Sequence, residues 1–381
     1  MGIKYKYILL CFLILLNPIF GVKAQQTNDF KVSVMLPFNS KLILQNNRST
    51  EKQLSDVCRE YYQGVLVALD SLGNTESNLN ITLKVFDTKK DSITIKKHLQ
   101  NDFVKQSNIV IGPALREGQI MMQNFSNQNR VYRISPFLTF TKSSINDSML
   151  ISFNPDLYSY ADILLNYLKN TGFDDINLIL IKGSTKNNEI IYKRFKEIEK
   201  GFASIKINYI DVYNSAKLKE YYKPLSSNYI FIISEDESVV NVAINYMAEV
   251  ENFENATVFG LKKWLDFKGV SAQNWQKLNV TVLTPFYADL NNEEVKWFSK
   301  KYLSKYNTLP SEFAFEGYRQ FMYLVQAYQK TNGNFAMLQN IENIKIFGLK
   351  NKIGSSFKSG SLYNRRLNMV RLENFELKLV D

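Results

Sequence analysis

Apolar residues recur along the chain in two alternating patterns: short apolar-rich runs, and spacings of three and four. The short runs predict strands, and they lie at 31–36, 81–86, 108–111, 131–135, 176–181, 206–212, 229–233, 257–261 and 280–285. The run at 176–181 is nearly all-apolar, which predicts a strand covered on both faces. Spacings of three and four predict amphipathic helices, at 53–72, 92–104, 116–128, 158–168, 189–200, 292–306 and 316–330. Strands that alternate with helices indicate parallel sheets.

The alternation of strands and helices occurs in two successive blocks, about 28–155 and 156–285. A helical section follows, and short strands are predicted near the end at 355–358, 368–372 and 375–380, separated by turn signals. A chain of this length exceeds what one ordinary core organises, so two lobes are expected.

The N-terminus carries the pattern of a cleaved secretory signal. Lys4 and Lys6 precede an apolar run at 8–16, and small or medium residues at 22–24 form the cleavage site before Gln25. That run is shorter than a membrane span and none like it follows, so residues 1–24 are predicted to be removed and the remainder to have no stable membrane insertion. Cys11 follows Leu10, which does not suit a lipid anchor.

Cleavage would leave Cys58 as the last cysteine, so no internal disulfide forms and stability must come from the core. Its location in an apolar helix pattern favours a small buried residue over a reactive thiol. The composition supports a large core, with 45% apolar and 13% aromatic residues.

The formal net charge of +11 raises the question whether the protein binds a nucleic acid or another anionic partner. Lysines are scattered among acidic residues with no block of like charges, so a basic solvated surface is favoured over a nucleic-acid site. The single histidine, His98, lies among lysines, and HExxH, CxxC, GxGxxG and GxxxxGK[ST] motifs are absent from the sequence. The sequence therefore predicts no enzyme, no metal site and no cofactor.

A set of short motifs, in order along most of the chain, carries a family resemblance. They are Val34–Asn39, Tyr61–Gly64, Ala68–Asp70, Val85–Thr88, Ile109–Pro113, Ile134–Pro136, Asn154–Pro155, Phe259–Gly260 with Trp264, Phe286–Tyr287, Leu309–Pro310 and Phe315–Tyr318. In this order the chain resembles the type 1 periplasmic binding proteins, which include the Leu/Ile/Val-binding proteins and receptor ligand-binding regions. Within them it is most similar to amino-acid ABC transporter substrate-binding-like proteins of Bacteroidetes.

The resemblance implies an α/β fold of two Rossmann-like parallel-sheet lobes joined by a hinge of several crossing segments. It assigns 28–155 with 286–333 to the first lobe and 156–285 with 334–381 to the second. It further implies a periplasmic solute-binding protein that closes on a small polar ligand, an amino acid or related carboxylate, without chemistry. A membrane permease or sensor would be its partner.

Ligand contacts are expected at the carboxyl ends of the strands, where open parallel sheets bind ligands. The candidate residues there are Asn39, Arg116, Ser135, Thr139, Ser184, Glu235, Trp264 and Tyr287. Arg116 suits a carboxylate through its planar fork, while Trp264 and Tyr287 suit stacking. Competing interpretations make Arg116 a solvated first-turn residue and Trp264 a core residue.

The chain also departs from the family pattern. Residues 114–116 contain none of the hydroxyls that hold an amino acid in relatives, and Ser152–Phe153 replace an arginine that is common before the crossing. These departures support an alternative function, a cell-envelope scaffold that keeps the fold but has lost its small ligand. A basic surface would suit contact with anionic envelope polymers.

Overall fold

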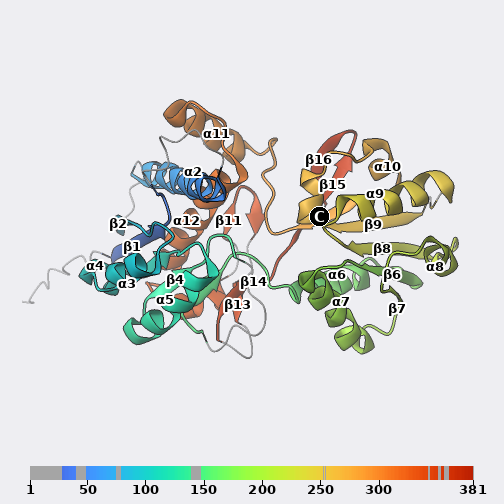
Figure 1. The fold of residues 1–381 in the computed structure, drawn as a ribbon, viewed down its shortest axis with the longest axis horizontal. Helices are drawn as coiled ribbons and strands as arrows, with labels where there is room; N and C mark the ends of the chain where they lie inside the picture. Colours follow the sequence, from blue (N-terminus) through green and yellow to red (C-terminus); the bar gives the residue numbers. More distant parts are fainter. Residues whose placement is uncertain are drawn as a thin grey trace, which may run out of the picture.

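The computed structural model describes residues 28–39, 49–73, 79–138, 147–251, 253, 255–341, 344–350, 353–355 and 360–380. They form two α/β lobes side by side (Figure 1), which confirms the predicted fold class. The predicted signal, 1–24, lies outside the described residues. No helix within the described residues combines the length and apolar character needed to cross a bilayer.

The first lobe is built on a seven-stranded sheet of order β13-β14-β5-β4-β3-β1-β2, parallel except for β13. Its strands are β1 Asn28–Leu36, β2 Leu79–Asp87, β3 Ile109–Ile111, β4 Tyr132–Ile134, β5 Leu150–Ser152, β13 Ile353–Ser355 and β14 Leu362–Asn364. Its helices are α2 Thr50–Leu72, α3 Ser92–Leu99, α4 Asp102–Lys105, α5 Arg116–Asn129, α11 Glu293–Tyr306, α12 Glu312–Lys330 and the 3-10 helix Phe335–Asn340. A hairpin, β11 Lys345–Ile346 and β12 Leu349–Lys350, packs beside them.

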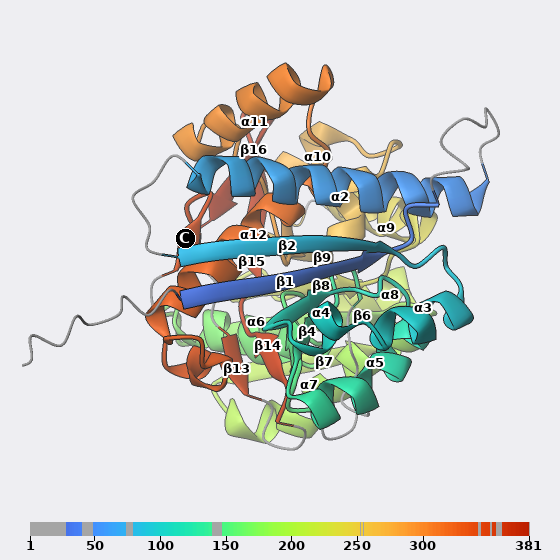
Figure 2. The same ribbon diagram turned by 90° about the vertical axis from the view of Figure 1, so that its left-hand side faces the viewer.

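Alternate side chains of β1 divide the first lobe into two cores. Val32 and Val34 face the large cluster under α2, α11 and α12, whereas Met35 faces a smaller cluster under α3, α4 and α5. Figure 2 shows α2 and α11 on one side of β1 and α3, α4 and α5 on the other. The single helix predicted at 92–104 is two helices, because the Asn101 side chain accepts a hydrogen bond from Phe103 N and starts α4 anew.

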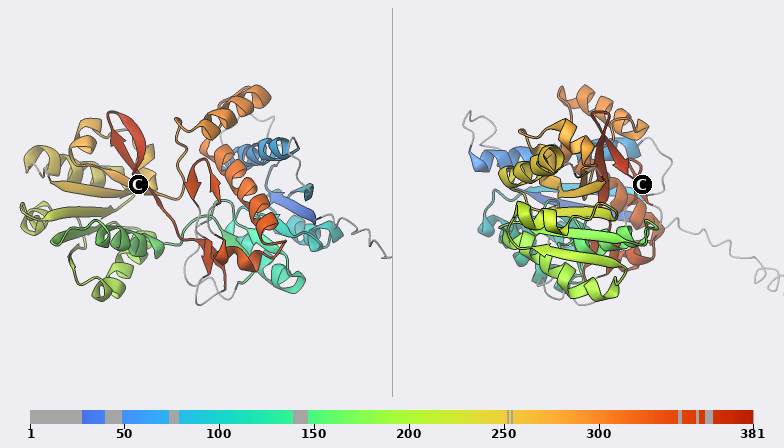
Figure 3. Two further views of the ribbon diagram at one scale, coloured as in Figure 1. Left: turned by 180° about the vertical axis from the view of Figure 1, so that it is seen from behind. Right: turned by 90° about the vertical axis from the view of Figure 1, so that its right-hand side faces the viewer.

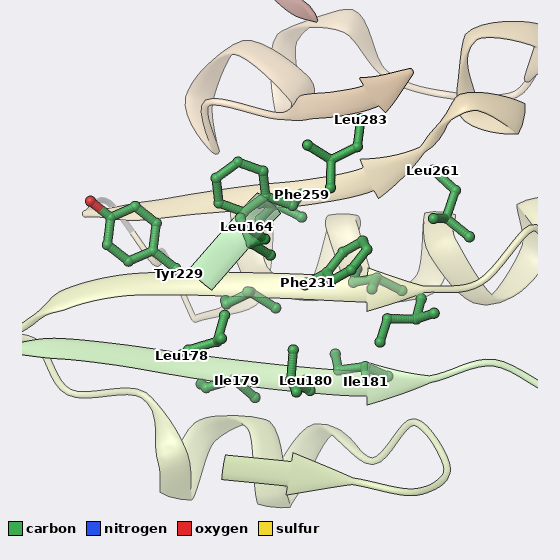
Figure 4. Packing of buried hydrophobic residues seen from close by; sticks show 14 of the residues in the cluster. Leu164, Leu178, Ile179, Leu180, Ile181, Tyr229, Phe231, Phe259, Leu261 and Leu283 are labelled. Carbon is green, nitrogen blue, oxygen red and sulfur yellow. The ribbon is translucent and has the colours of Figure 1, made fainter. Parts of the chain in front are cut away.

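The second lobe repeats the design with sheet order β16-β15-β10-β9-β8-β6-β7. Its strands are β6 Ile176–Lys182, β7 Ile205–Ile210, β8 Ser227–Ile233, β9 Ala256–Leu261, β10 Thr281–Thr284, β15 Asn368–Glu373 and β16 Glu376–Val380. Its helices are α6 Ser159–Lys169, α7 Lys186–Ile198, α8 Ser215–Tyr221, α9 Glu237–Asn245, α10 Ala272–Lys277, the 3-10 helices Glu199–Gly201 and Lys262–Asp266, and the π-helix Tyr246–Val250. The nearly all-apolar run at 176–181 is buried on both faces, as predicted (Figure 4).

Three segments connect the lobes: 153–158 after β5, 285–292 after β10, and 365–367 between β14 and β15. The last is the red segment that runs between the lobes when the molecule is seen from behind (Figure 3, left). The assignment of 334–381 to the second lobe is wrong up to about residue 364, since β13 and β14 pair into the first sheet and β11–β12 packs on its core. Which sheet takes a short strand depends on long-range pairing, which a local pattern does not encode.

Helices α2 and α12 cross at two glycines from the recognised motifs. A Cβ on Gly64 would lie 1.9 Å from the Ala314 carbonyl oxygen, and one on Gly317 would lie 1.9 Å from the Tyr61 carbonyl oxygen. Hydrogen atoms at both positions let the two backbones touch, which explains why glycine occupies them.

A buried ion pair fixes β4 in the first lobe. Arg133 Nη1 donates to Asp147 Oδ1 at 2.7 Å, and both side chains are at most 4% exposed. Arg133 Nε also donates to Gln119 Oε1 at 3.1 Å, and the Asp147 carbonyl accepts from Ser361 Oγ at 2.8 Å. The pair thereby ties β4 to α5 and to the segment that enters β14.

Cys58 is buried in α2, as predicted, and we expect it to be chemically inert in the folded protein. Burial, and secondarily the charge of Asp87, raises the pKa of its thiol from 9.0 to about 12, so the nucleophilic thiolate is scarce at neutral pH. Iodoacetamide should modify Cys58 only after unfolding in guanidinium. Because the folded pKa is the higher one, the thiol's contribution to stability is complete below pH 9 and is lost as the pH rises towards 12. Rapid alkylation of the native protein would contradict this assignment.

Candidate functional site

The strand order of each sheet reverses at one point. β1 lies between β2 and β3 in the first lobe, and β6 lies between β7 and β8 in the second. Ligands of open parallel sheets bind outside the carboxyl ends of the strands at such a point. A glycine follows a strand at each reversal: a Cβ on Gly112 would lie 2.1 Å from Met35 O, and one on Gly183 would lie 2.4 Å from Ile233 O.

The crevice of the first lobe contains a pocket of about 440 Å³. It is formed by the ends of β1, β2 and β3 and by the first turns of α3 and α5; its lining is Pro37, Thr88, Lys90, Asp91, Ser92, Ile95, Pro113, Ala114, Leu115, Glu117, Gly118 and Met121. The lining combines apolar walls with side chains of both charges, which suits a small zwitterionic or polar ligand.

Helix α5 begins in this pocket without a side-chain cap. Its N-cap is Leu115, and no described side chain accepts a hydrogen bond from the N–H groups of 116–118. Among the α-helices of the described residues, α6 also lacks a cap from its N-cap side chain, whereas the N-cap side chain caps the others, as Asp91 does for α3 and Ser311 for α12. Open N–H groups at the positive end of a helix form a site for an anion such as a carboxylate.

Charged side chains surround that helix end. Lys90 lines the pocket, whereas Arg116, the first residue of α5, is exposed and follows the lining residue Leu115 without being part of the lining itself. Asp91 and Glu117 supply negative charge. Hydrogen bonds from the hydroxyl and N–H of Thr94 hold the pKa of Asp91 below its usual value, so this carboxylate stays ionised at neutral pH. The site can therefore hold a carboxylate and an ammonium together.

The carboxyl edge of the second sheet carries two of the predicted residues. Ser184 follows β6 and Glu235 follows β8, and both are exposed. The next residue in each case, Thr185 or Asp236, uses its side chain to cap the helix that follows, α7 or α9. Glu235 lies close enough to Tyr160 at the start of α6 that its charge, after burial, raises the pKa of that phenol.

Asn39 lies at the rim of the first crevice. It is half-buried in a left-handed turn with φ 48°, and its N–H donates to Asp87 Oδ1 at 3.2 Å. The same Asp87 oxygen accepts from Phe38 N at 3.1 Å, so the carboxylate at the end of β2 shapes the loop after β1. Asn39, Arg116, Ser184 and Glu235 all lie at carboxyl edges of the sheets.

Three predicted residues have structural contacts instead. Ser135 is 1% exposed and its hydroxyl accepts from Leu138 N, so the expectation that it faces the cleft is wrong. Trp264 is also 1% exposed and donates to Ser234 O at 2.7 Å, which makes it a core residue of the second lobe. Tyr287 is half-buried and its hydroxyl donates to Leu377 O at 2.7 Å. Thr139 lies outside the described residues.

The crossing segments are held by residues that sequence reasoning missed. Asn364 Nδ2 donates to Phe153 O at 3.1 Å, and Asn368 Nδ2 donates to Pro285 O at 3.0 Å, so the asparagines on either side of the third crossing bond to the other two. The guanidinium of Arg319 lies 5.5 Å from the Phe153 ring and 5.2 Å from the Phe286 ring. The one signal for Arg319 was a charged residue inside the apolar stripe of α12.

One ion pair of the described residues bridges the lobes away from the crossings. Lys262 Nζ, after β9, lies 2.8 Å from Glu312 Oε2 at the start of α12, and both side chains are more than 40% exposed. An exposed pair of this kind contributes roughly 0–1 kcal/mol. The pair therefore adds little to the connection that the three crossings make between the lobes.

Residues 62–376 match the sequence model of the family described as "Receptor family ligand binding region". No curated protein matches the sequence.

Solved structures share the fold at low sequence identity. A Rhodospirillum rubrum protein assigned to branched-chain amino acid ABC transporters superposes with a TM-score of 0.68 and 11% identity over 92% of this chain and 100% of that one. An ABC transporter substrate-binding protein from Desulfitobacterium hafniense in complex with Leu gives 0.54 and 13% over 92% and 100%. The C-domain of LpoA from Haemophilus influenzae, a regulator of PBP1A, gives 0.61 and 13% over 92% and 99%.

Proposed function

Because the chain belongs to the receptor family ligand-binding region, we propose that it is an extracytoplasmic solute-binding protein. Its two lobes close on a small polar ligand, an amino acid or related carboxylate-bearing compound, and release it unchanged. Closure about a hinge would present a new surface to a membrane permease or sensor. The signal pattern at 1–24 supports a periplasmic location.

The observation that carries this proposal is the uncapped start of α5 in a pocket with both charges. Relatives are expected to hold the ligand's carboxylate with hydroxyls, which residues 114–116 do not provide. Backbone N–H groups of 116–118 can donate the same hydrogen bonds, with Arg116 and Lys90 adding positive charge and Glu117 receiving an ammonium. Loss of the hydroxyls therefore does not require loss of the ligand.

Catalysis has no part in the proposal. The ring of His98 packs 5.4 Å from that of Phe86, and its Nε2 donates to the backbone oxygen of Asp87 at 2.9 Å. The imidazole thereby supports the end of β2. Within the described chain, no group of three or more His, Cys, Asp or Glu side chains is placed to hold a metal.

The solved relatives support the choice of ligand class. Two of the structures named above are assigned to ABC transporters, and one of them holds Leu. We extend that class to this chain because its pocket combines a carboxylate site with apolar walls such as Ile95 and Met121. The closer kinship with the Bacteroidetes proteins stays a prediction.

A thermal-shift screen of residues 25–381 with amino acids, short peptides, sugars and nucleosides tests the proposal. A ligand present at 100 times its Kd raises the free energy of unfolding by about 2.7 kcal/mol. For a chain of this size, each kcal/mol raises the unfolding midpoint by roughly 2–4 °C. Arg116→Gln should remove most of the shift for carboxylate ligands. Arg130→Gln is the matched control, since it makes the same charge change at the other end of α5 and should leave the shift intact.

One observation favours a second function, a scaffold of the cell envelope. The LpoA C-domain, described as a regulator of PBP1A, shares the fold at a TM-score of 0.61, and the net charge of +11 suits anionic polymers. Absence of any shift across the screen would favour this role, and a hit that Arg116→Gln leaves unchanged would reject the α5 site.

A further inference from the structure

A second pocket, of about 280 Å³, lies between the two lobes beside the third crossing. Its walls come from α6 and the end of β16 in the second lobe, from the β11–β12 hairpin of the first, and from residues 366–369 of the crossing itself. It shares no lining residue with the pocket at the start of α5.

The walls of this pocket are mainly apolar. Ile163 contributes from α6, Leu349 from the hairpin, Leu367 from the crossing and Leu379 from β16. Apolar surface that stays in contact with water is unfavourable, so an apolar ligand group gains free energy by covering it. At about 30 Å³ for each water-sized group, the space suits a short chain or a single ring.

Arg366 is the one charged residue in the lining of this pocket. No ion pair involving its guanidinium occurs among the described residues. Its backbone is fixed, because Arg366 N donates to Asn364 Oδ1 at 3.2 Å and Asn368 anchors the following turn to Pro285 O. A guanidinium at the edge of an apolar space, on a fixed backbone, matches a carboxylate joined to an apolar tail.

The geometry points to a binding site for a short amphipathic carboxylate, such as a short-chain fatty acid, in this inter-lobe pocket. Leu379 belongs to a strand of the second sheet yet packs against the core of the first lobe. Movement of one lobe against the other therefore changes the shape of the pocket. A ligand that binds one arrangement of the lobes more tightly than another shifts the population towards that arrangement, by an amount set by the difference between the two affinities. This effect on the lobes rests on the proposed lobe closure, whereas the binding itself does not.

Isothermal titration of the protein with hexanoate tests the site. We expect saturable binding that Arg366→Gln weakens at least tenfold, and hexan-1-ol, which lacks the charge, should bind more weakly than hexanoate. Ile163→Trp should also abolish binding by filling the space from α6. Arg365→Gln is the matched control: it removes the neighbouring charge, from a residue outside the lining, and should change the affinity by less than about threefold. Circular dichroism confirms that each variant is folded.

Several results would overturn the inference: no heat of binding with hexanoate, equal losses in Arg366→Gln and Arg365→Gln, or tight binding that survives Ile163→Trp. Loss of hexanoate binding in Arg116→Gln would place the carboxylate in the first-lobe crevice and would also reject the second site. Because the two sites share no residue, failure of the amino-acid screen leaves the hexanoate result independent.

Discussion

Replacing Asp147 with alanine is expected to lower the free energy of unfolding by about 3–5 kcal/mol. The substitution would leave the Arg133 guanidinium, 2% exposed, in the core without its counter-charge. Gln119 Oε1 would still accept a hydrogen bond from Arg133, but an amide oxygen carries no charge and cannot replace a carboxylate. The Gln119 side chain is also held in place, because its Nε2 donates to Pro113 O at 2.6 Å. Loss of the pair should therefore loosen β4 and α5 together.

Urea unfolding monitored by circular dichroism measures this loss. The matched control is Asp162→Ala, which breaks the half-exposed pair with Arg194 and should cost about 1 kcal/mol or less. The double substitution Arg133→Met with Asp147→Leu should recover most of the stability, because it removes both charges and refills the space. An Asp147→Ala protein as stable as the control variant would show that the pair is not buried in solution.

Gly317→Ala is expected to cost about 3 kcal/mol, near the upper end for an overpacked core. The added methyl group would lie 1.9 Å from Tyr61 O. The atoms nearest to it all belong to the backbone of Tyr61, so no side chain can rotate away to relieve the clash. The intrinsic gain in helix propensity of about 1 kcal/mol offsets only part of the clash. Separation of α2 from α12 would also disturb the hydrogen bond from the Tyr61 hydroxyl to Gln320 Oε1, 2.8 Å long.

Thermal and urea unfolding of Gly317→Ala and Gly64→Ala should both show this loss. Gly201→Ala is the matched control, since nothing lies within 4 Å of a Cβ at that position. Its midpoint should stay close to that of the unsubstituted protein. If the Gly317 and Gly201 variants unfold together, α2 and α12 do not cross at the distance described.

The periodic pattern predicted most strands and helices because burial on both faces imposes long apolar runs such as 176–181. The pattern did not predict which sheet takes the strands near the end of the chain, because that depends on pairing between residues far apart in the sequence. β13 and β14 are three residues each, and their own residues do not indicate that they join the first sheet. The buried Arg133 lies in a strand of only three residues. So short a strand shows too little alternation of apolar and polar residues to predict that the Arg133 side chain points into the core.

The predicted strand ends located the carboxyl edges of the two sheets but did not give side-chain directions. Arg116, Ser184 and Glu235 lie at the carboxyl edges, because that depends only on where each strand stops. Ser135 and Trp264 follow strands too, yet both turn inward, since the loop's own N–H and the Ser234 carbonyl provide hydrogen-bond partners there. The uncapped start of α5 was visible as leucine at the N-cap position, where serine, threonine, asparagine or aspartate is usual.

The most direct test of ligand-driven closure is the distance between spin labels on the two lobes, with and without amino acid. Cysteines at Ile120 in α5 and Lys186 in α7 are exposed attachment sites, and the buried Cys58 should not react. With saturating L-leucine, or the strongest amino acid from the thermal-shift screen, the distance should shorten to a single narrower distribution. An unchanged distance with the ligand bound would contradict lobe closure, and the absence of any ligand across the whole thermal-shift screen would contradict the solute-binding function itself.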